Sequence, residues 1–414
     1  MPKMPGVKAP DNMTQSFRYE VMNLLGRKTT SFPGAQPVSF GSRHLLELQT
    51  QDYYVCEKTD GIRCLMYLTR EGDKEVVYLI DRKNEYYHVP DLHFPLEGDD
   101  LASFHTETIL DGELVNDTDP TSKQVSMKYL VFDCLIMDSN NLMHRTLDKR
   151  LAYFRQKLLS PYEALYKKFP DELQFLPFTI HFKHQEFGYA MEQMFNRIIP
   201  SLHHGSDGLI FTCRNSPYTP GTDEHILKWK PESENSVDFR MHLRFPTVEP
   251  DPGGAGGDEM AYFDYTAFPQ VELTVNGGDV DGDVDWGSLA LSPSEWETMK
   301  SRNEPLNDRI VECYMDKSTN WRYLRFRDDK EESNHISTVK SVMESIHDAV
   351  TKEDLINHEK KIKSEWKRRQ SDMDDGRREA EARKPVRGTN AQNGEAINGV
   401  GLKRKIEESE QQTG

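Results

Sequence analysis

The sequence predicts an α+β fold, with one large domain of mixed strands and helices and a smaller domain of short strands. Three observations lead to this class. Residues 53–137 contain several runs of β-branched and aromatic residues separated by turn residues, which is typical of strands. Apolar residues recur at helical spacing in residues 147–159 and 188–202. After Pro246 the strand-like runs become shorter, as they are in small barrels.

The larger domain is expected to span residues 16–242. Residues 1–15 are polar and rich in proline, so they are expected to be disordered. A short amphipathic helix is expected at residues 16–25, followed by an ordered loop at residues 32–40. Two strands are expected on either side of a turn at residues 58–61. Further strands are expected at residues 76–81, 85–89, 108–115, 128–137, 207–212, 225–231 and 237–245.

Residues 243–335 are expected to form an OB-fold β-barrel, because they combine several short strand-like runs with one helix near residues 292–302. Residues 336–370 have apolar side chains on one helical face, which predicts a C-terminal helical segment. Residues 371–414 are charged and rich in glycine and asparagine, so this tail is expected to be disordered.

Composition restricts the classes of protein that are possible. The net charge of -17 is unfavourable for a protein with a broad nucleic-acid-binding face, but residues 228–230 and 322–330 are locally basic, which favours a restricted anion site. The five cysteines are scattered without C-x-x-C spacing, which argues against a disulfide framework and a zinc site. No long apolar run or signal peptide is recognised, so we expect a protein of the cytosol or nucleus without a membrane span.

Lys58 stands before an Asp-Gly turn and is the first candidate for chemistry. A K-x-D-G pattern arises by chance in about one chain of this length in ten, and a solvated lysine is the ordinary interpretation. A nucleophilic lysine would need a lowered pKa, since its usual pKa near 10.4 leaves about one amine in 2,500 unprotonated at pH 7. Arg63, Lys228, Lys230 and a bound metal are candidates for lowering it. A nucleotide α-phosphate is an electrophile suited to such a cationic site.

Carboxylates that could bind the metal, Mg²⁺ or Mn²⁺, follow the same strands. Asp111 and Glu113 lie on one face of an expected strand, although a turn-forming role for Asp111 is equally compatible with its position. Asp207 precedes a buried apolar run and is expected at the mouth of the site. No glycine-rich phosphate loop occurs, so phosphates would be held by side chains.

Seven segments in this order resemble the collinear motifs of eukaryotic mRNA-capping guanylyltransferases, of the stand-alone fungal type. These enzymes belong to the covalent nucleotidyltransferase superfamily, which also contains the ATP-dependent DNA ligases. The segments are EKTDGIR (57–63), IDR (80–82), LDGELV (110–115), YLVFDCL (129–135), SDGLIFT (206–212), LKWKP (227–231) and WRYLRFRDDKEESNH (321–335). The resemblance implies a nucleotidyltransferase domain of antiparallel sheets with flanking helices, the ATP-grasp-like fold of DNA ligases and capping enzymes, followed by the OB domain.

The resemblance also implies roles for individual residues. Lys58 would carry a covalent GMP, with Glu113 and Asp207 near the metal. GTP would be bound by Arg63, Arg82, Glu113, Phe132, Lys183, Ile210, Lys228 and Lys230. Among these, Phe132 and Ile210 would enclose the guanine, Lys183 would read its edge, and Lys228 and Lys230 would hold the α-phosphate. The β- and γ-phosphates would be covered by Arg325, Arg327, Asp329 and Lys330.

Two alternatives remain at this point: an ATP-dependent polynucleotide ligase and a non-catalytic OB-fold RNA-binding scaffold. Against a ligase, Asp207 stands where ligases generally present Glu, and no additional DNA-encircling domain is visible. The resemblance further implies 5′-diphosphate RNA as acceptor, a separate RNA 5′-triphosphatase subunit and the phosphorylated tail of RNA polymerase II as partners, and a nuclear location. Lys403, Arg404 and Lys405 form a weak nuclear-import candidate.

Overall fold

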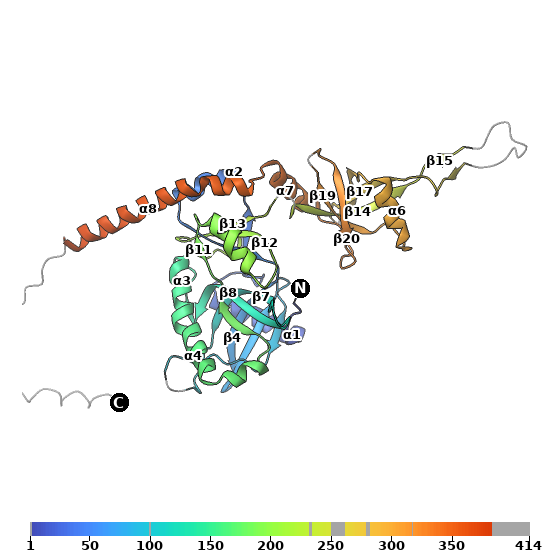
Figure 1. Ribbon diagram of the computed structural model, residues 1–414. Coiled ribbons are helices and arrows are strands. Elements are labelled where there is room, and N and C mark those ends of the chain that lie inside the picture. The colour runs from blue at the N-terminus through green and yellow to red at the C-terminus, as the bar shows by residue number, and fades with distance from the viewer. Residues whose placement is uncertain are drawn as a thin grey trace, which may run out of the picture. The chain divides into compact units, whose positions relative to one another are not determined.

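Strands from distant parts of the sequence assemble into three main sheets (Figure 1). This computed structural model describes residues 2–98, 101–231, 234–249, 261–278, 282–316 and 318–382. The chain divides into two units, Met1–Lys367 and Arg368–Gly414. All three sheets belong to the first unit, so the following paragraphs concern that unit until the C-terminal helix is reached.

The first sheet has the strand order β1-β6-β5-β4-β7-β8-β10, with β9 paired to β8. All its pairs are antiparallel except β8 with β10. The strands are β1 (Val7–Lys8), β4 (Ile62–Glu71), β5 (Lys74–Ile80), β6 (Tyr86–Val89), β7 (Thr108–Thr118), β8 (Val125–Met137), β9 (Asn140–Asn141) and β10 (Thr179–Phe182).

Apolar residues on both faces of the first sheet are buried. One face packs against α3 (Leu147–Tyr153), the π-helical η1 (Phe154–Leu159) and α4 (Ser160–Lys168), with the 3-10 helix η2 (Pro170–Phe175) following them. The other face packs against α1 (Asp11–Leu24) through Phe17 and Val21. Figure 1 shows these helices on the two sides of the sheet. Burial on both faces explains why the strand sequences are nearly continuous apolar runs.

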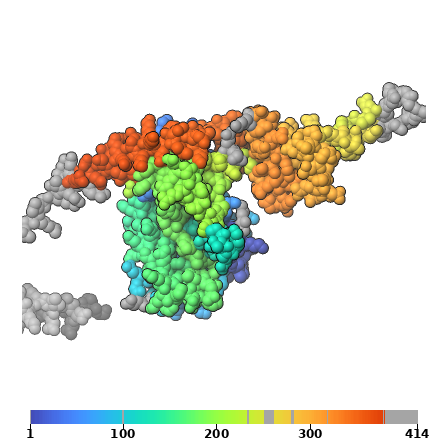
Figure 2. All heavy atoms as spheres, in the orientation of Figure 1, coloured from blue at the N-terminus to red at the C-terminus, as the bar shows by residue number. Residues whose placement is uncertain are grey.

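The second sheet has the order β11-β3-β12-β13-β2, in which β13 and β2 are parallel. Its strands are β2 (Ala35–Ser39), β3 (Tyr53–Thr59), β11 (Glu186–Phe187), β12 (Ser206–Cys213) and β13 (Gly221–Trp229). Four helical segments accompany it, namely α2 (Ser42–Thr50), α5 (Met191–Gln193), η3 (Met194–Ile198) and η4 (Ile199–Ser201). Leu355 and Ile362 of α8 (Lys352–Ala382) complete this core, and Figure 2 shows the start of α8 lying on it.

The third sheet has the order β18-β17-β14-β19-β20 and packs against α6 (Pro293–Ser301) and α7 (Ile336–His347). Its strands are β14 (Ser236–Arg244), β17 (Gln270–Asn276), β18 (Asp283–Ser288), β19 (Ile310–Met315) and β20 (Trp321–Phe326). The short pair β15 (Thr247–Val248) and β16 (Tyr262–Phe263) stands apart from it.

The described part of this domain forms a five-stranded sheet that does not close into a complete barrel. The edge strands β18 and β20 meet only through an isolated bridge between Leu289 and Trp321. A barrel needs a continuous ladder around its circumference. Here β18 ends at Ser288 and the chain turns into α6, whose start is fixed by a capping box between Ser292 and Glu295.

The structure corrects the predicted boundaries as well. The strand predicted at residues 237–245 is β14, which belongs to the third sheet, so the change of domain falls before Ser236 rather than after residue 242. Residues 1–15 are not wholly irregular, because Val7 and Lys8 pair with β6 and α1 begins at Asp11. The helix predicted at residues 147–159 continues to Lys168. Pro161 does not end it, because this proline occupies the first turn of α4, where proline is tolerated.

The second unit contains the C-terminal part of α8. The prediction of disorder from residue 371 is wrong up to Ala382, because the helix continues to that residue. Residues such as arginine, glutamate and alanine are good helix formers, and Arg368 lies 3.3 Å from Asp372 one helical turn later. Residues 383–414, including the import candidate at 403–405, lie outside the described residues. No helix in the described part of the chain is long and apolar enough to cross a membrane.

Candidate active site

A cavity of about 270 Å³ is lined by residues of the first two sheets. It contains most of the side chains that the sequence motifs single out. The predicted residues that line it are Lys58, Arg63, Arg82, Glu113, Phe132, Lys183, Ile210, Lys228 and Lys230. We call this cavity the central pocket.

Lys58 lies near the end of β3 and its amine points to a carboxylate. Its Nζ donates to Oδ1 of Asp207 at 2.6 Å, and the other oxygen of Asp207 lies 2.7 Å from Nζ of Lys230. Burial raises the pKa of Asp207, but hydrogen bonds from Lys230 and Lys58 outweigh burial and lower it. An ammonium group bonded to a carboxylate is not a nucleophile, so this ion pair must open before Lys58 reacts.

Two glycines allow this geometry. A β-carbon on Gly61 would lie 2.3 Å from the carbonyl oxygen of Leu114, so only glycine lets the turn after Lys58 pack against β7. Gly208 has a φ of +151° at an irregularity in the register of β12, and a β-carbon there would lie 2.1 Å from the carbonyl oxygen of Trp229. This irregularity directs Asp207 towards Lys58 and Lys230.

Arg82 and Lys228 are cations without a protein partner. Among the described residues, neither side chain makes a hydrogen bond or an ion pair, although both line the central pocket. Burial lowers the pKa of Lys228, and repulsion from Lys230, Lys58 and Arg82 lowers it further. Uncompensated positive charge of this kind is favourable only when an anion binds, which indicates a phosphate site.

Replacing Lys228 with methionine is expected to stabilise the fold and weaken nucleotide binding. A lysine with a lowered pKa destabilises the folded state fully at neutral pH, and this cost disappears as the pH rises towards 10.5. We therefore expect the free energy of unfolding of Lys228→Met to increase by about 0.5–1 kcal/mol at pH 7, with a smaller gain at higher pH. GTP binding should weaken by about tenfold to a hundredfold.

Urea unfolding at pH 7 and pH 10, together with GTP titration, measures both effects. Lys74→Met is the matched control, because Lys74 is exposed at the start of β5 and away from the central pocket. A Lys228→Met protein with weaker binding but lower stability at pH 7 would contradict the electrostatic argument.

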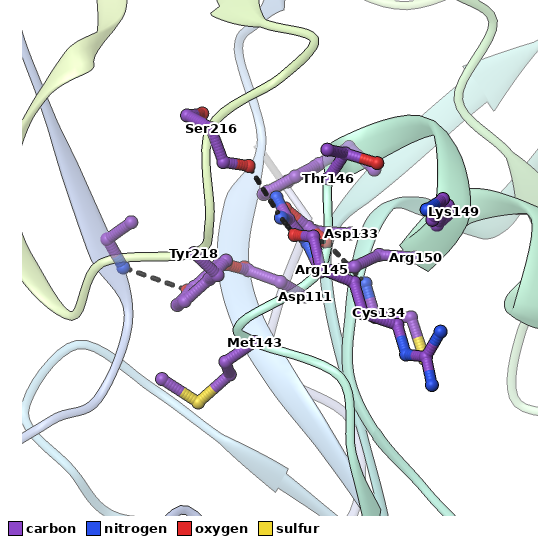
Figure 3. Close-up of polar contacts among 12 residues, drawn as sticks. Asp111, Asp133, Cys134, Met143, Arg145, Thr146, Lys149, Arg150, Ser216 and Tyr218 are labelled. Atoms are coloured by element: carbon purple, nitrogen blue, oxygen red, sulfur yellow. Dashed lines mark hydrogen bonds and ion pairs between the residues drawn. The ribbon is translucent and has the colours of Figure 1, made fainter. Parts of the chain in front are cut away.

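Arg63 lines the central pocket, but its guanidinium group already forms hydrogen bonds within the protein. Its Nε and Nη2 donate to the two oxygens of Asp111 at 3.1 and 2.7 Å, and Nη1 donates to the carbonyl oxygen of Ala35 at 2.5 Å. Tyr218 also donates to Oδ2 of Asp111, at 2.6 Å (Figure 3). Asp111 is thus a buried partner of Arg63 and Tyr218 rather than a turn former. The predicted contact of Arg63 with nucleotide stays a prediction.

Lys183 forms part of the buried lining of the central pocket. Its Nζ donates to Oγ1 of Thr59 and lies 3.7 Å from Glu57 and 3.9 Å from Glu113. Burial lowers the pKa of Lys183, but Glu57 and Glu113 outweigh burial and raise it. The amine is therefore held in its charged form, which donates hydrogen bonds and accepts none.

Phe132 provides an aromatic surface beside these cations. The guanidinium carbon of Arg63 lies 5.5 Å and the amine of Lys183 lies 5.8 Å from the centre of its ring. Ile210 lines the same pocket from β12, the strand that pairs with β3. The structure thus brings together the two apolar residues predicted to enclose a base, although it does not test that role.

A buried ion pair involves Asp133, the residue after Phe132, and no sequence motif assigned it a role. Nε and Nη2 of Arg150 donate to the two oxygens of Asp133 at 2.7 and 2.8 Å, and Nη1 donates to the carbonyl oxygens of Arg145 and Ser216 (Figure 3). The arginine therefore connects β8 to α3 and to the loop that carries Tyr218. An aspartate within the apolar run YLVFDCLIM was the available signal, because buried carboxylates need partners.

The structure does not bring the remaining predicted residues into the central pocket. Arg325, Arg327, Asp329 and Lys330 lie on β20 and the turn after it. They form ion pairs within the third-sheet domain: Arg325 lies 2.6 Å from Glu312, Arg327 lies 3.0 Å from Asp238, and Lys330 also contacts Asp238. Arg327 is bonded to Asp329 as well, at 2.8 Å. Their predicted contact with the β- and γ-phosphates stays a prediction.

The predicted metal ligands form no complete protein site. Among the described residues, no group of three or more His, Cys, Asp or Glu side chains could hold a metal ion. Both oxygens of Asp207 already accept from lysines, and Glu113 accepts from the amide of Gly61 at 3.3 Å. Mg²⁺ is commonly held by one or two carboxylates together with substrate phosphates, and the pocket fits only that arrangement.

The two-sheet fold and the lysine-centred cationic pocket define a nucleotidyltransferase domain. The model of the mRNA capping enzyme catalytic domain matches residues 2–232, and that of the mRNA capping enzyme C-terminal domain matches residues 234–356. The chain therefore belongs to the mRNA capping enzyme family. This membership confirms the predicted enzyme class, an mRNA guanylyltransferase, and the family uses GTP as its substrate.

Curated relatives are similar in sequence to this protein over most of the chain. The mRNA-capping enzyme subunit alpha of Neurospora crassa is 49% identical over 374 residues, which cover 88% of this chain and 93% of the relative. The protein of the same name from Schizosaccharomyces pombe is 44% identical, with coverages of 85% and 86%. The one from Saccharomyces cerevisiae is 38% identical, with coverages of 91% and 89%.

Among solved structures, mycobacterial DNA ligase D complexed with ATP and MES is 16% identical to this chain. The match has a TM-score of 0.34 and covers 72% of this chain and 95% of the ligase chain. A TM-score this low supports no conclusion about function.

Proposed function

We propose that Lys58 carries GMP between the two half-reactions of mRNA guanylylation. In the first, the deprotonated Lys58 Nζ attacks the α-phosphorus of GTP, a P–N bond forms, and pyrophosphate leaves. In the second, a terminal oxygen of a 5′-diphosphate RNA attacks the same phosphorus and the P–N bond breaks. Lys58 regains a proton, and the product carries a GpppN cap.

One observation carries this proposal. The Lys58 amine and two cations without protein partners, Arg82 and Lys228, line one pocket. Positive charge in this arrangement stabilises a triphosphate as charge develops on the leaving pyrophosphate. For Lys58 to attack, its contact with Asp207 must open, and the phosphate oxygens of GTP offer the lysines alternative partners.

The residues around the nucleotide divide the remaining tasks. Phe132 and Ile210 enclose the guanine, Lys183 donates to its edge, and Arg82 with Glu113 contacts the ribose. Lys228 and Lys230 hold the α-phosphate, and Arg325, Arg327, Asp329 and Lys330 act on the outer phosphates. A divalent ion, Mg²⁺ or Mn²⁺, would neutralise phosphate charge and would be held by nucleotide oxygens with Asp207 or Glu113.

The proposed partners follow from the chemistry and from the names of the relatives. The relatives are called subunit alpha, which implies a partner subunit. We propose an RNA 5′-triphosphatase as that subunit, because the second half-reaction needs a diphosphate end. The phosphorylated tail of RNA polymerase II as a docking partner and the nucleus as location belong to the same proposal.

Incubation with α-labelled GTP and Mg²⁺ or Mn²⁺, followed by a denaturing gel, tests the covalent step. We expect a labelled band that acid and hydroxylamine remove, as befits a phosphoramidate, and mass spectrometry should place GMP on Lys58. Label taken only from ATP would instead support a ligase. A folded protein that takes label from neither nucleotide would support the non-catalytic scaffold.

A further inference from the structure

Gln185 lies on the same segment of the central pocket as Lys183. This segment connects β10 to β11, and the backbone amide of Lys183 donates to the carbonyl oxygen of Val131 at 2.8 Å. Two residues later, Gln185 also lines the pocket. The short connection thus brings a charged donor and a neutral amide to the wall where Phe132 is found.

The amide of Gln185 is only half satisfied. Its Nε2 donates to the carbonyl oxygen of Phe132 at 3.4 Å. Its Oε1 is buried and has no hydrogen-bond partner among the described residues. If the side-chain amide were rotated by half a turn, Oε1 would face the carbonyl oxygen of Phe132, and two acceptors cannot form a hydrogen bond. The contact with Phe132 therefore shows that Oε1 is the atom without a partner. A buried acceptor without a donor destabilises the protein, and a ligand that supplies the donor removes that cost.

The free acceptor complements guanine and not adenine. The guanine edge carries the O6 acceptor beside the N1–H and 2-amino donors, whereas adenine carries an amino donor at C6 and an acceptor at N1. The Lys183 ammonium is a donor only, and Oε1 of Gln185 is an acceptor. Adenine in the same orientation would place its amino group against Lys183 and its N1 against Gln185, with neither atom paired.

We infer that Gln185 is a specificity-determining residue, whose Oε1 accepts a hydrogen bond from N1–H or the 2-amino group of guanine. This inference rests on the proposed function, because it concerns the base of the nucleotide that reacts with Lys58. Gln185 positions and selects the base and takes no part in bond making.

The test measures kcat/KM of covalent labelling for GTP, ITP and ATP in the full-length protein and in Gln185→Met. Methionine keeps the approximate length of the side chain and removes both polar atoms. We expect the GTP value to fall by about tenfold to a hundredfold while the ATP value does not fall, so that the GTP-to-ATP ratio decreases by the same factor. ITP lacks the 2-amino group, so an equal loss with ITP identifies N1–H as the donor. A loss confined to GTP identifies the 2-amino group.

Gln193→Met is the matched control, because Gln193 donates to Glu186 and does not line the pocket. Equal losses with GTP and ATP in Gln185→Met would mean a merely structural role and would overturn the inference. If that variant does not fold, ITP and N1-methyl-GTP are compared with GTP on the unmodified protein. Use of both analogues as efficiently as GTP would overturn the inference, and discrimination against either would support it.

The experiments distinguish an error in the role of Gln185 from an error in the proposed covalent role of Lys58. If the unmodified protein forms no adduct with GTP, the covalent role of Lys58 is wrong. If it forms the adduct and the GTP-to-ATP ratio is unchanged in folded Gln185→Met, only the role of Gln185 is wrong.

Discussion

Replacing Lys58 with alanine is expected to abolish GMP attachment without unfolding the protein. No adduct is expected on Lys228 or Lys230, because the proposed function assigns both to holding the α-phosphate rather than attacking it. The free energy of unfolding should change by no more than about 1 kcal/mol, since the lost ion pair is only partly buried and Asp207 keeps Lys230 as partner. A denaturing gel after incubation with labelled GTP measures the adduct, and urea unfolding measures stability.

Lys58→Arg separates charge from nucleophilicity. Arginine keeps the positive charge and can still pair with Asp207, but its guanidinium does not lose a proton at accessible pH. It should bind GTP and form no adduct. Lys74→Ala, at an exposed position on β5, should label normally. Residual labelling of either Lys58 variant would show that another residue accepts GMP.

Replacing Arg150 with alanine is expected to destabilise the protein by about 3–5 kcal/mol, because the change leaves the buried carboxylate of Asp133 without its cation. Arg150 and Asp133 are 1% and 4% exposed. The carbonyl oxygens of Arg145 and Ser216 lose their donor at the same time. Urea unfolding measures the effect, and Figure 3 shows why the loss reaches the pocket wall: the same loop carries Tyr218, the partner of Asp111.

Lys149→Ala is the control for Arg150→Ala, since Lys149 is the exposed neighbour on α3 and should change stability by less than about 0.5 kcal/mol. The double variant Arg150→Met with Asp133→Leu should be more stable than Arg150→Ala, because it leaves no unpaired charge. A loss below about 1 kcal/mol for Arg150→Ala would show that the pair is not essential to this wall.

Much of the site could be predicted because each motif brings its own residues together along the chain. Lys58 and Arg63 flank one turn, and Lys228 and Lys230 alternate near the end of one strand, so local geometry alone places them. The apolar runs around them predicted strands because burial on both faces selects such residues. The ordered start of the chain was mispredicted because Val7 and Lys8 pair with the distant strand β6. The end of α8 was mispredicted because the charged, glycine- and asparagine-rich composition of the tail was given more weight than its good helix formers up to Ala382.

The sequence by itself determined the chemistry of this protein: the candidate nucleophile, the cations for a triphosphate, and the family whose motifs they share. Only the tertiary structure decided which side chains form hydrogen bonds and ion pairs with one another. It placed Asp207 between Lys58 and Lys230, committed Arg63 to Asp111, and left one oxygen of Gln185 unpaired. The physical reason is that hydrogen bonds and ion pairs form between atoms within about 3 Å, and the register of paired strands, rather than distance along the chain, sets which atoms come that close.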